Sequence, residues 1–324
     1  MKRKRRSSPA RAAMKLLCLM LGVILAVMVS TTVYFQSQVG LLPSLEELQL
    51  PSLPQLSFGA KDDQIGGPGS HIVNILLIGQ DRREGEERAR SDSMILCTFN
   101  KRTKQITMTS FLRDLYVPIP GYGANRINAA YTLGGMKLLD KTLRENFGIY
   151  IDGNVEVDFG HFAQIIDLLG GVDMELRQDE ANFINKETGS DLSAGMQRLN
   201  GEQALMYSRI RKLDSDGDFS RTDRQRKVMS ALFQAYKNSG INTMLSLVKQ
   251  ILPMVDTDMG TIEMMLLAME LVPMLSQAEV VSQHVPAAGT YTDQNIQGMS
   301  VLVPDTEAVR QMLENTLLDT AAVS

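Results

Sequence analysis

The hydrophobic positions after residue 70 fall into two kinds of pattern. Residues 72–79, IVNILLIG, form a nearly continuous apolar run that ends in glycine, which is typical of a strand buried on both faces. Residues 93–100 and 105–112 are two more apolar runs, and the turn-like KRTK between them predicts a hairpin. Residues 127–147 instead have helical spacing, and Gly148 is the expected C-cap of this helix.

The same two patterns continue to the end of the chain. Further strands are predicted at 154–157, 172–176, 278–285 and 300–303, and further helices at 159–169, 200–210, 220–238, 241–252, 260–275 and from 305 onward. Because strands and helices are interspersed and the central strands are buried, we expect an α/β fold. The predicted architecture is a three-layer α–β–α sandwich with a mixed central sheet.

The N-terminal region has the pattern of a membrane anchor. Residues 16–35 contain no charged side chain, and about twenty such residues are enough for a helix to span the hydrocarbon core. A cleaved signal peptide is the alternative, but residues 28–32 offer no clear small-x-small cleavage site. The sequence therefore predicts a basic tail over 1–15, an uncleaved transmembrane helix over 16–35, a Leu/Pro/Ser-rich stalk over 36–70 and a folded domain over 71–324.

Charge and cysteine content predict where the domain lies relative to the membrane and argue against some classes of ligand. The net charge of −4 divides into +7 over the first 15 residues and −11 over the rest. The basic tail predicts a cytoplasmic N-terminus, so the single-pass protein carries its domain outside the cell membrane. An acidic domain argues against nucleic-acid binding, and three scattered histidines argue against a zinc site. Cys18 lies in the apolar run and Cys97 in a predicted buried strand, so no intrachain disulfide is expected.

Residues 201–228 carry the densest group of arginines in a predicted helical region. Arg209 and Arg211 precede a short loop, while Arg221 and Arg224 begin the next helix and share one face with Gln225 at i, i+3 and i+4 spacing. Guanidinium groups bind phosphate oxygens in a bidentate geometry and keep their charge at any relevant pH, so this face predicts an anion site. The alternative is a solvated helix end with ordinary salt bridges, because three aspartates lie in the loop between the two pairs.

Charged residues also follow the ends of the predicted buried strands. Asp81 and Asp92 lie at the ends of neighbouring strands, where two carboxylates can hold Mg²⁺ together with phosphate oxygens. Arg113 follows the third strand, and Arg126 precedes a helix N-terminus, which itself favours an anion. Taken alone, each of these features is better explained as a solvated loop or a lone ion pair than as a binding site. Together with the arginine pairs they suit a pyrophosphate, whose transfer depends on positioning and charge neutralisation.

The motifs that the sequence lacks exclude several classes of substrate. The sequence has no Walker loop, nucleophile elbow or HExxH motif, and ATP is scarce outside the membrane, so a lipid-borne pyrophosphate is the natural donor. A polyprenyl tail needs an apolar channel, for which the Met-rich stretch 244–275 is one candidate. The alternative for this stretch is ordinary helix-bundle core.

Several ordered blocks of sequence resemble the LytR–CpsA–Psr family of cell-wall ligases. They are NILLIGQDRR (74–83), RSDSM (90–94), FLRD (111–114), RINAAY (126–131), LLGGV (168–172), LNGEQALMYSRIR (199–211) and DFSRTDRQRKV (218–228). Two positions depart from the family pattern. Leu112 replaces the usual proline, which alters loop rigidity, and Arg126 replaces the usual lysine, which keeps the cation.

The resemblance implies transfer of a glycopolymer phosphate from an undecaprenyl-pyrophosphate carrier in the membrane to peptidoglycan, at the C6 hydroxyl of N-acetylmuramic acid. Asp81 and Asp92 match the acidic positions tied to catalysis and to Mg²⁺, with Mn²⁺ as an alternative ion. The matching pyrophosphate-binding residues are Arg83, Arg113, Arg209, Arg211, Arg221, Arg224 and Gln225, with Arg90 and Arg126 as further candidates and Arg113 also counted as catalytic. Either aspartate could be the base that activates the acceptor hydroxyl.

Two other functions fit the same features. The first is a non-catalytic lipid-pyrophosphate-binding regulator of envelope genes, which would need the arginines but no carboxylate beside them. The second is a polyprenyl-pyrophosphate phosphatase, in which water replaces the sugar hydroxyl.

Overall fold

The computed structural model describes residues 64–80, 91–211, 213–215, 217–238, 250–260, 263–264, 267, 271 and 278–318. The predicted basic tail, transmembrane helix and most of the stalk lie outside these ranges, as do most of the predicted helices 241–252 and 260–275. Among the described residues, no helix is both long and apolar enough to cross a membrane.

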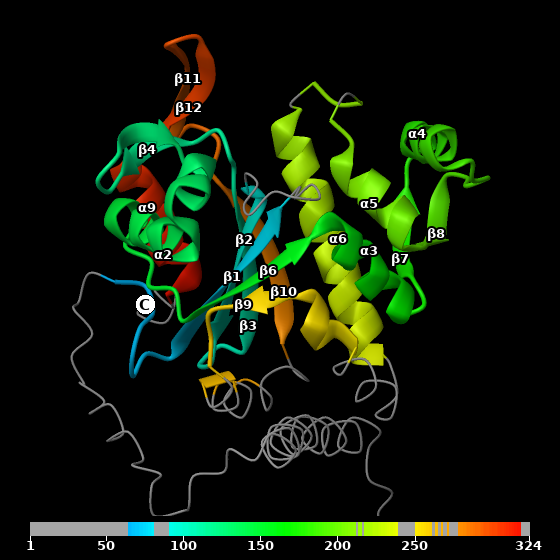
Figure 1. The fold of residues 1–324 in the computed structure, drawn as a ribbon, viewed down its shortest axis with the longest axis horizontal. Helices are drawn as coiled ribbons and strands as arrows, with labels where there is room; N and C mark the ends of the chain where they lie inside the picture. The colour runs from blue at the N-terminus through cyan, green and yellow to red at the C-terminus, as the bar shows by residue number, and fades with distance from the viewer. Residues whose placement is uncertain are drawn as a thin grey trace, which may run out of the picture.

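A six-stranded mixed sheet forms the centre of the domain (Figure 1). Its strands are β10 (Glu279–Val285), β3 (Gln105–Phe111), β2 (Ser91–Asn100), β1 (Ile72–Gln80), β6 (Gly153–Asp158) and β9 (Asp256–Thr257), in that spatial order. The β1–β2, β2–β3 and β6–β9 pairs are antiparallel, whereas β1–β6 and β3–β10 are parallel. The predicted mixed α/β fold and the β2–β3 hairpin are confirmed.

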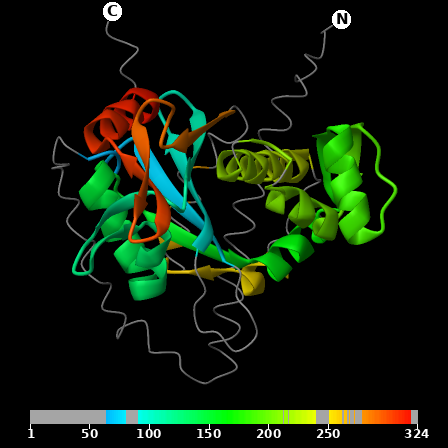
Figure 2. The ribbon, with the colours of Figure 1, turned by 90° about the horizontal axis from the view of Figure 1, so that it is seen from above.

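Helices cover both faces of this sheet, as Figure 2 shows. On one face, α2 (Asn128–Phe147) and α9 (Thr306–Leu317) pack against Leu76, Ile78 and Leu96. On the other face, α3 (Phe159–Leu168) packs on β6 and α6 (Asp218–Asn238) packs on β2, β3 and β10. Because helices cover both faces, the side chains on both faces of the sheet must be apolar. Successive strand residues point to opposite faces, so the sequence shows near-continuous hydrophobic runs.

A second, smaller core lies beside the sheet and sets the position of two short helices. It is built from α3, β7 (Val172–Leu176), α4 (Gln178–Thr188), β8 (Gly195–Leu199), α5 (Gly201–Arg209) and one side of α6. Asn200 caps α5 by accepting a hydrogen bond from the Gln203 backbone N–H. A Cβ at Gly201 would lie 2.0 Å from the Ala163 carbonyl oxygen, so glycine allows α5 to lie directly against α3.

The packed domain begins earlier than position 71, so the predicted stalk of residues 36–70 is too long at its C-terminal end. Ile65 is buried in the main core and forms an isolated bridge with Ile149. Its backbone N–H donates to the Gly148 carbonyl oxygen at 2.8 Å. Residues 64–70 therefore belong to the fold, and the remainder of the predicted stalk lies outside the described residues.

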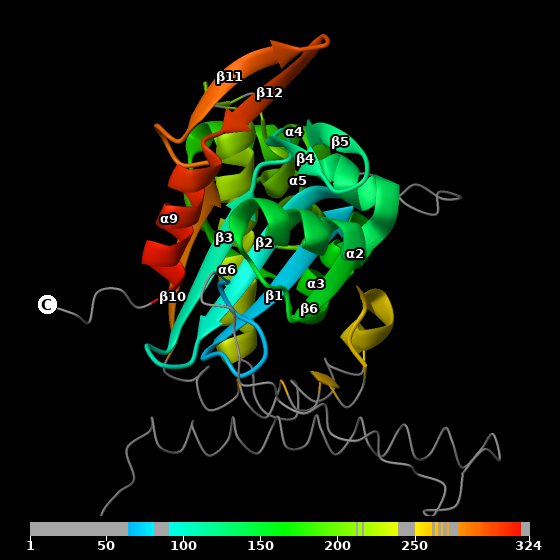
Figure 3. The same ribbon diagram turned by 90° about the vertical axis from the view of Figure 1, so that its left-hand side faces the viewer.

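Helix α2 ends where the sequence predicts. Gly148 has a left-handed conformation and its N–H donates to the Arg144 carbonyl oxygen, as a C-capping glycine should. Among the described residues, several elements were not predicted: α4, β8, β9, β4 (Tyr116–Ile119), β5 (Gly123–Arg126), β11 (Tyr291–Ile296) and a short 3-10 helix, η1 (Leu252–Met254). The polar strand β11 pairs with β12 (Met299–Pro304) in a hairpin that stands out from the body of the domain (Figure 3). A strand so exposed carries no apolar alternation, so sequence pattern alone does not reveal it.

Candidate functional site

A polar cavity of about 250 Å³ lies where the start of β2 meets the ends of three helices. Its lining residues come from β2, α3, α5 with the residues just after it, and α6: Asp92, Phe159, Arg209, Arg211, Arg221 and Gln225. The structure thus brings together five of the residues predicted from sequence, and adds Phe159.

Arg221 is the most deeply buried cation of this cavity, with only 2% of its surface exposed. Its Nη2 contacts the Asp218 carboxylate at 2.9 Å and donates to the Asp92 carbonyl oxygen at 3.4 Å. Within the described ranges, its Nε and Nη1 are buried without a hydrogen-bond partner. Burial, with repulsion from Arg113 and Arg211, lowers the pKa of Arg221 to about 10 in spite of Asp218. Two unsatisfied donors on a buried cation are costly unless an anion completes them.

Arg209 and Arg211 supply the exposed side of the cavity. Ile210 between them is fully buried in the smaller core, whereas both arginines are exposed. The Arg209 guanidinium lies 4.8 Å from the centroid of the Phe159 ring, a cation–π contact. Three guanidinium groups therefore surround one small cavity, which is the arrangement expected for a multiply charged anion.

Asp92 faces the same cavity and is held by Arg113. The Arg113 Nη1 donates to Asp92 Oδ1 at 2.9 Å, and Arg113 Nη2 lies 3.6 Å from Asp218. Although burial lowers the pKa of Arg113, its three carboxylate neighbours Asp218, Asp92 and Asp114 raise it above its ordinary value. Arg113 does not line the cavity itself, so its direct effect is to orient Asp92.

Two arginines predicted to bind pyrophosphate have other partners in the structure. The Arg126 guanidinium donates to Asp114 at 3.1 Å and does not line the polar cavity. Arg224 is 3% exposed, and its guanidinium binds Glu180 at 2.9 Å and Asp214. The prediction that Arg224 contacts the anion is not supported, because its two carboxylate partners hold it on the side of α6 that faces the smaller core.

A second cavity, of about 400 Å³ and almost wholly apolar, adjoins the first. It lies between the sheet and the helices α3 and α6, and Phe159 and Gln225 border both cavities. Its walls include Ile95, Cys97 and Met108 from the sheet and Ile165, Met229 and Leu232 from the helices. The burial of Cys97 raises the pKa of its thiol to about 12, so it behaves as an apolar side chain here.

The Met-rich stretch 244–275, considered as a channel for the prenyl tail, contributes Ile251 and Val255 to this cavity but none of its described methionines. The cavity methionines are Met108 and Met229, whereas Met259 packs against the cluster around Val73 and Ile75. Met259 thus fits the core alternative. Met244, Met265, Met269 and Met274 lie outside the described residues.

Three predicted site residues, Asp81, Arg83 and Arg90, fall within 81–90 and lie outside the described residues. The positions that flank this segment are paired, Gln80 with Ser91, in the β1–β2 register. Two residues of the site were missed at the sequence level. Asp218 was counted only among the aspartates between the two arginine pairs, and Phe159 directly follows the end of a predicted strand, which is the signal that could have revealed it.

Comparison with known proteins decides the family. The LytR_cpsA_psr family model matches residues 57–317. The chain belongs to the LytR–CpsA–Psr family. Among sequence relatives of this family, the regulatory protein MsrR of Staphylococcus aureus strain Mu50 is 40% identical over 176 residues, 53% of this chain and 52% of MsrR.

A second relative carries the name of a transferase. The polyisoprenyl-teichoic acid–peptidoglycan teichoic acid transferase TagT of Bacillus subtilis strain 168 is 39% identical over 178 residues, 53% of this chain and 55% of TagT. The match thus spans about half the length of either curated relative. A structure of TagT with bound octaprenyl pyrophosphate lipid superposes with a TM-score of 0.60 at 28% identity, covering 80% of this chain and 98% of TagT. The LytR–CpsA–Psr fold is therefore shared across nearly the whole of that structure.

Proposed function

We propose that this protein is a Mg²⁺-dependent phosphotransferase that moves a glycopolymer phosphate from an undecaprenyl-pyrophosphate carrier to peptidoglycan. The observation that carries the proposal is the junction of the two cavities. A buried arginine with two unsatisfied donors lines a polar cavity, and that cavity shares Phe159 and Gln225 with an apolar one. A ligand with a pyrophosphate head and a prenyl tail matches both halves. The names of TagT and of its lipid complex agree with this chemistry.

The pyrophosphate would be held by Arg209, Arg211 and Arg221, with Gln225 at the junction with the tail. Arg83 and Arg90 remain proposed ligands from outside the described residues. In the reaction, the acceptor hydroxyl oxygen attacks the phosphorus that bears the glycopolymer. The bond from that phosphorus to the bridging oxygen breaks, and polyprenyl monophosphate leaves. Preorganised guanidinium groups stabilise the charge that develops on the phosphoryl oxygens.

We assign Asp92 as the base that takes the proton of the acceptor hydroxyl, because its carboxylate lines the polar cavity. Arg113 orients this carboxylate through the 2.9 Å hydrogen bond. A carboxylate beside phosphate oxygens also suits Mg²⁺, so Asp92 and Asp81 would hold the ion, with Mn²⁺ as an alternative. When bound, the ion would neutralise part of the phosphate charge.

The reaction requires the domain to lie on the outer face of the cell membrane, with the N-terminus cytoplasmic, as the charge pattern predicts. A reporter enzyme fused after Ser324 should be active only outside the membrane. Activity of this fusion in the cytoplasm would contradict the proposed location and, with it, peptidoglycan as the acceptor.

The regulator is the second candidate, and the observation that favours it is the 40% identity to a protein named as a regulatory protein, MsrR. One assay separates the two. The purified domain is incubated with a lipid-linked pyrophosphoryl saccharide, a peptidoglycan oligomer and a Mg²⁺ series. Transfer of labelled saccharide supports the enzyme. Tight lipid binding without transfer supports the regulator, and release of the saccharide phosphate to water supports the phosphatase.

A further inference from the structure

Ile210 determines where the two arginines beside it point. Its side chain is fully buried in the smaller core and its backbone is extended, with φ −60° and ψ 127°. Side chains alternate in direction along an extended segment. Burial of Ile210 therefore directs the next side chain, Arg211, away from the core. Arg209, the last residue of α5, lines the polar cavity beside it, and both positions depend on the backbone of Ile210 being held in place.

Arg224 provides that restraint from the neighbouring helix. Its Nη1 donates to the Ile210 carbonyl oxygen at 3.4 Å, and its Nε donates to Glu180 Oε1 at 2.9 Å. Its Nη2 donates to Asp214, in the loop that leads from Arg211 to Arg221. One buried guanidinium thus contacts the end of α5, the loop after it and α4.

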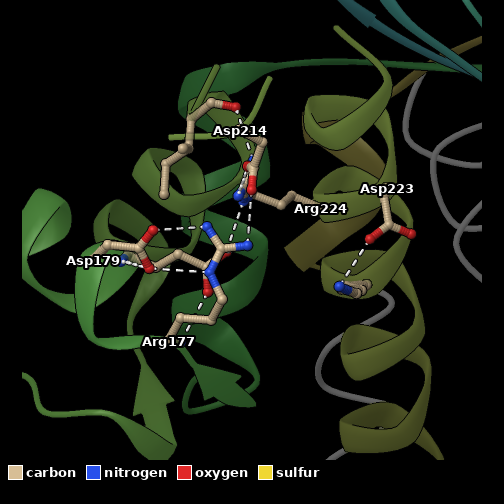
Figure 4. Close-up of polar contacts among 8 residues, drawn as sticks. Arg177, Asp179, Asp214, Asp223 and Arg224 are labelled. Carbon is tan, nitrogen blue, oxygen red and sulfur yellow. Dashed lines mark hydrogen bonds and ion pairs between the residues drawn. The ribbon is translucent and has the colours of Figure 1, made fainter. Parts of the chain in front are cut away.

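A second arginine completes the restraint on the loop, as Figure 4 shows. Arg177 Nη1 donates to Asp214 Oδ1 at 2.9 Å, and its Nε and Nη2 donate to Asp179 at 3.0 and 2.9 Å. Asp214 therefore lies between two guanidinium groups. The hydrogen bond from Arg224, followed by that from Arg177, holds the pKa of Asp214 below its usual range. Asp214 therefore stays ionised and held in place, and it lies in the sequence between Arg211 and Arg221, which both line the polar cavity.

We propose that Arg224 is a positioning residue: through Ile210, Asp214 and Glu180 it fixes the segment from Arg209 to Arg221 so that three guanidinium groups converge on the pyrophosphate. This inference rests on the proposed function and deepens it. A buried ion pair is by itself weak evidence of a stabilising role, because proteins with hydrophobic residues in its place are often equally stable. The informative feature is that the ion pairs of Arg224 lie around the loop. Small displacements of binding groups reduce activity strongly, by up to about a hundredfold for 1 Å.

The test uses two substitutions on the same network. Substitution of Arg224 leaves Glu180 buried and unpaired, so that variant can fail to fold. Asp214→Asn leaves the pair of Arg224 and Glu180 intact and releases only the loop. Asp179→Asn is the matched control, because Asp179 binds the same Arg177 but lies outside the loop. Asp214→Glu is the conservative variant, since it restores a carboxylate.

The probe is geranylgeranyl pyrophosphate, titrated calorimetrically well below the Tm of each variant. Asp214→Asn should raise Kd by roughly tenfold, Asp179→Asn should leave it unchanged, and Asp214→Glu should recover most of the loss. In the transfer assay, Asp214→Asn should raise KM more than it lowers kcat. Equal Kd values for Asp214→Asn and the wild type would overturn the positioning role.

Amide hydrogen exchange decides the inference even if the wild type binds no prenyl pyrophosphate, which would count against the proposed function. Exchange at Ile210 and Arg211 should accelerate in Asp214→Asn and stay at the wild-type rate in Asp179→Asn. Unchanged exchange at both positions in Asp214→Asn would overturn the inference by itself.

Discussion

Arg113 Nη1 lies 2.9 Å from Asp92 Oδ1, and this pair joins the end of β3 to the start of β2 at the edge of the polar cavity. The Asp92 side chain is 23% exposed and the Arg113 side chain 22%, so the carboxylate is accessible while its orientation is fixed. A base that must reach an incoming hydroxyl needs both properties.

Asp92→Asn should lose most transfer activity, by roughly 10²- to 10⁴-fold, while still binding lipid, because an amide keeps the shape but accepts no proton. Transfer of labelled saccharide to peptidoglycan oligomers is measured beside lipid binding. Asp223→Asn is the control, since Asp223 pairs with Arg226 and Lys227 and does not line the cavity. Wild-type turnover in Asp92→Asn would exclude it as the base.

Arg221→Met should weaken binding of prenyl pyrophosphate by about one to two decades, since a charge-assisted contact to an anion contributes roughly 1.5–3 kcal/mol. Methionine fills similar apolar space but supplies neither the charge nor the two buried donors. Arg198→Met tests for general loss of positive charge, because Arg198 is an exposed arginine paired with Asp173. Equal weakening by both substitutions would show that the buried donors of Arg221 have no special role.

Ile165→Phe should weaken binding in the apolar cavity without affecting binding in the polar cavity. Ile165 belongs to α3 and lines only the apolar cavity, so the added ring occupies space proposed for the prenyl chain. Each methylene kept out of an apolar site forfeits about 0.8 kcal/mol, so losing two weakens binding by roughly tenfold. Calorimetry with geranylgeranyl pyrophosphate should show this loss, whereas inorganic pyrophosphate should bind as before. An equal loss for both probes would contradict a separate tail cavity.

Asp140 should make stability depend on pH. Burial raises the pKa of Asp140 to about 6; the hydrogen bond from Asn154 opposes this rise and the charge of Asp258 adds to it. This folded-state pKa lies above the unfolded value. The contribution of Asp140 to the free energy of unfolding is therefore highest below about pH 4 and is lost as the pH rises through 6.

Asp140→Asn removes this titration while keeping an acceptor for the Asn154 amide, which donates to Asp140 at 2.9 Å. The free energy of unfolding of the variant, relative to the wild type, should therefore increase by about 2–3 kcal/mol between pH 4 and pH 8. Thermal unfolding of both proteins across this range measures the difference. A difference that does not change with pH would refute the raised pKa.

Sequence pattern predicted the parts of this molecule in which one periodicity dominates. The buried runs of β1 to β3 and the glycine-capped end of α2 have no competing interpretation.

The arginine face of α6 shows what the sequence pattern cannot predict. On a helix with about 100° per residue, Arg224 lies roughly 60° to one side of Arg221 and Gln225 roughly 40° to the other. Sharing a face therefore does not mean sharing a cavity when the helix is packed on both flanks. Gln225 faces the cavity, and Arg224 faces Glu180. No sequence rule identifies which flank meets which neighbour, since that depends on tertiary packing.

Phe159 and Gln225 form a wall common to the polar and the apolar cavity. Two sites with a common wall act as tethered sites for any molecule that has both a charged head and an apolar tail. Once the tail is bound, the head is presented at an effective concentration that can reach the millimolar range, as for short flexible linkers. Neither half therefore needs high affinity alone. A ligand with both parts can therefore be captured tightly, while free phosphates and free lipids, which match only one half, dissociate quickly.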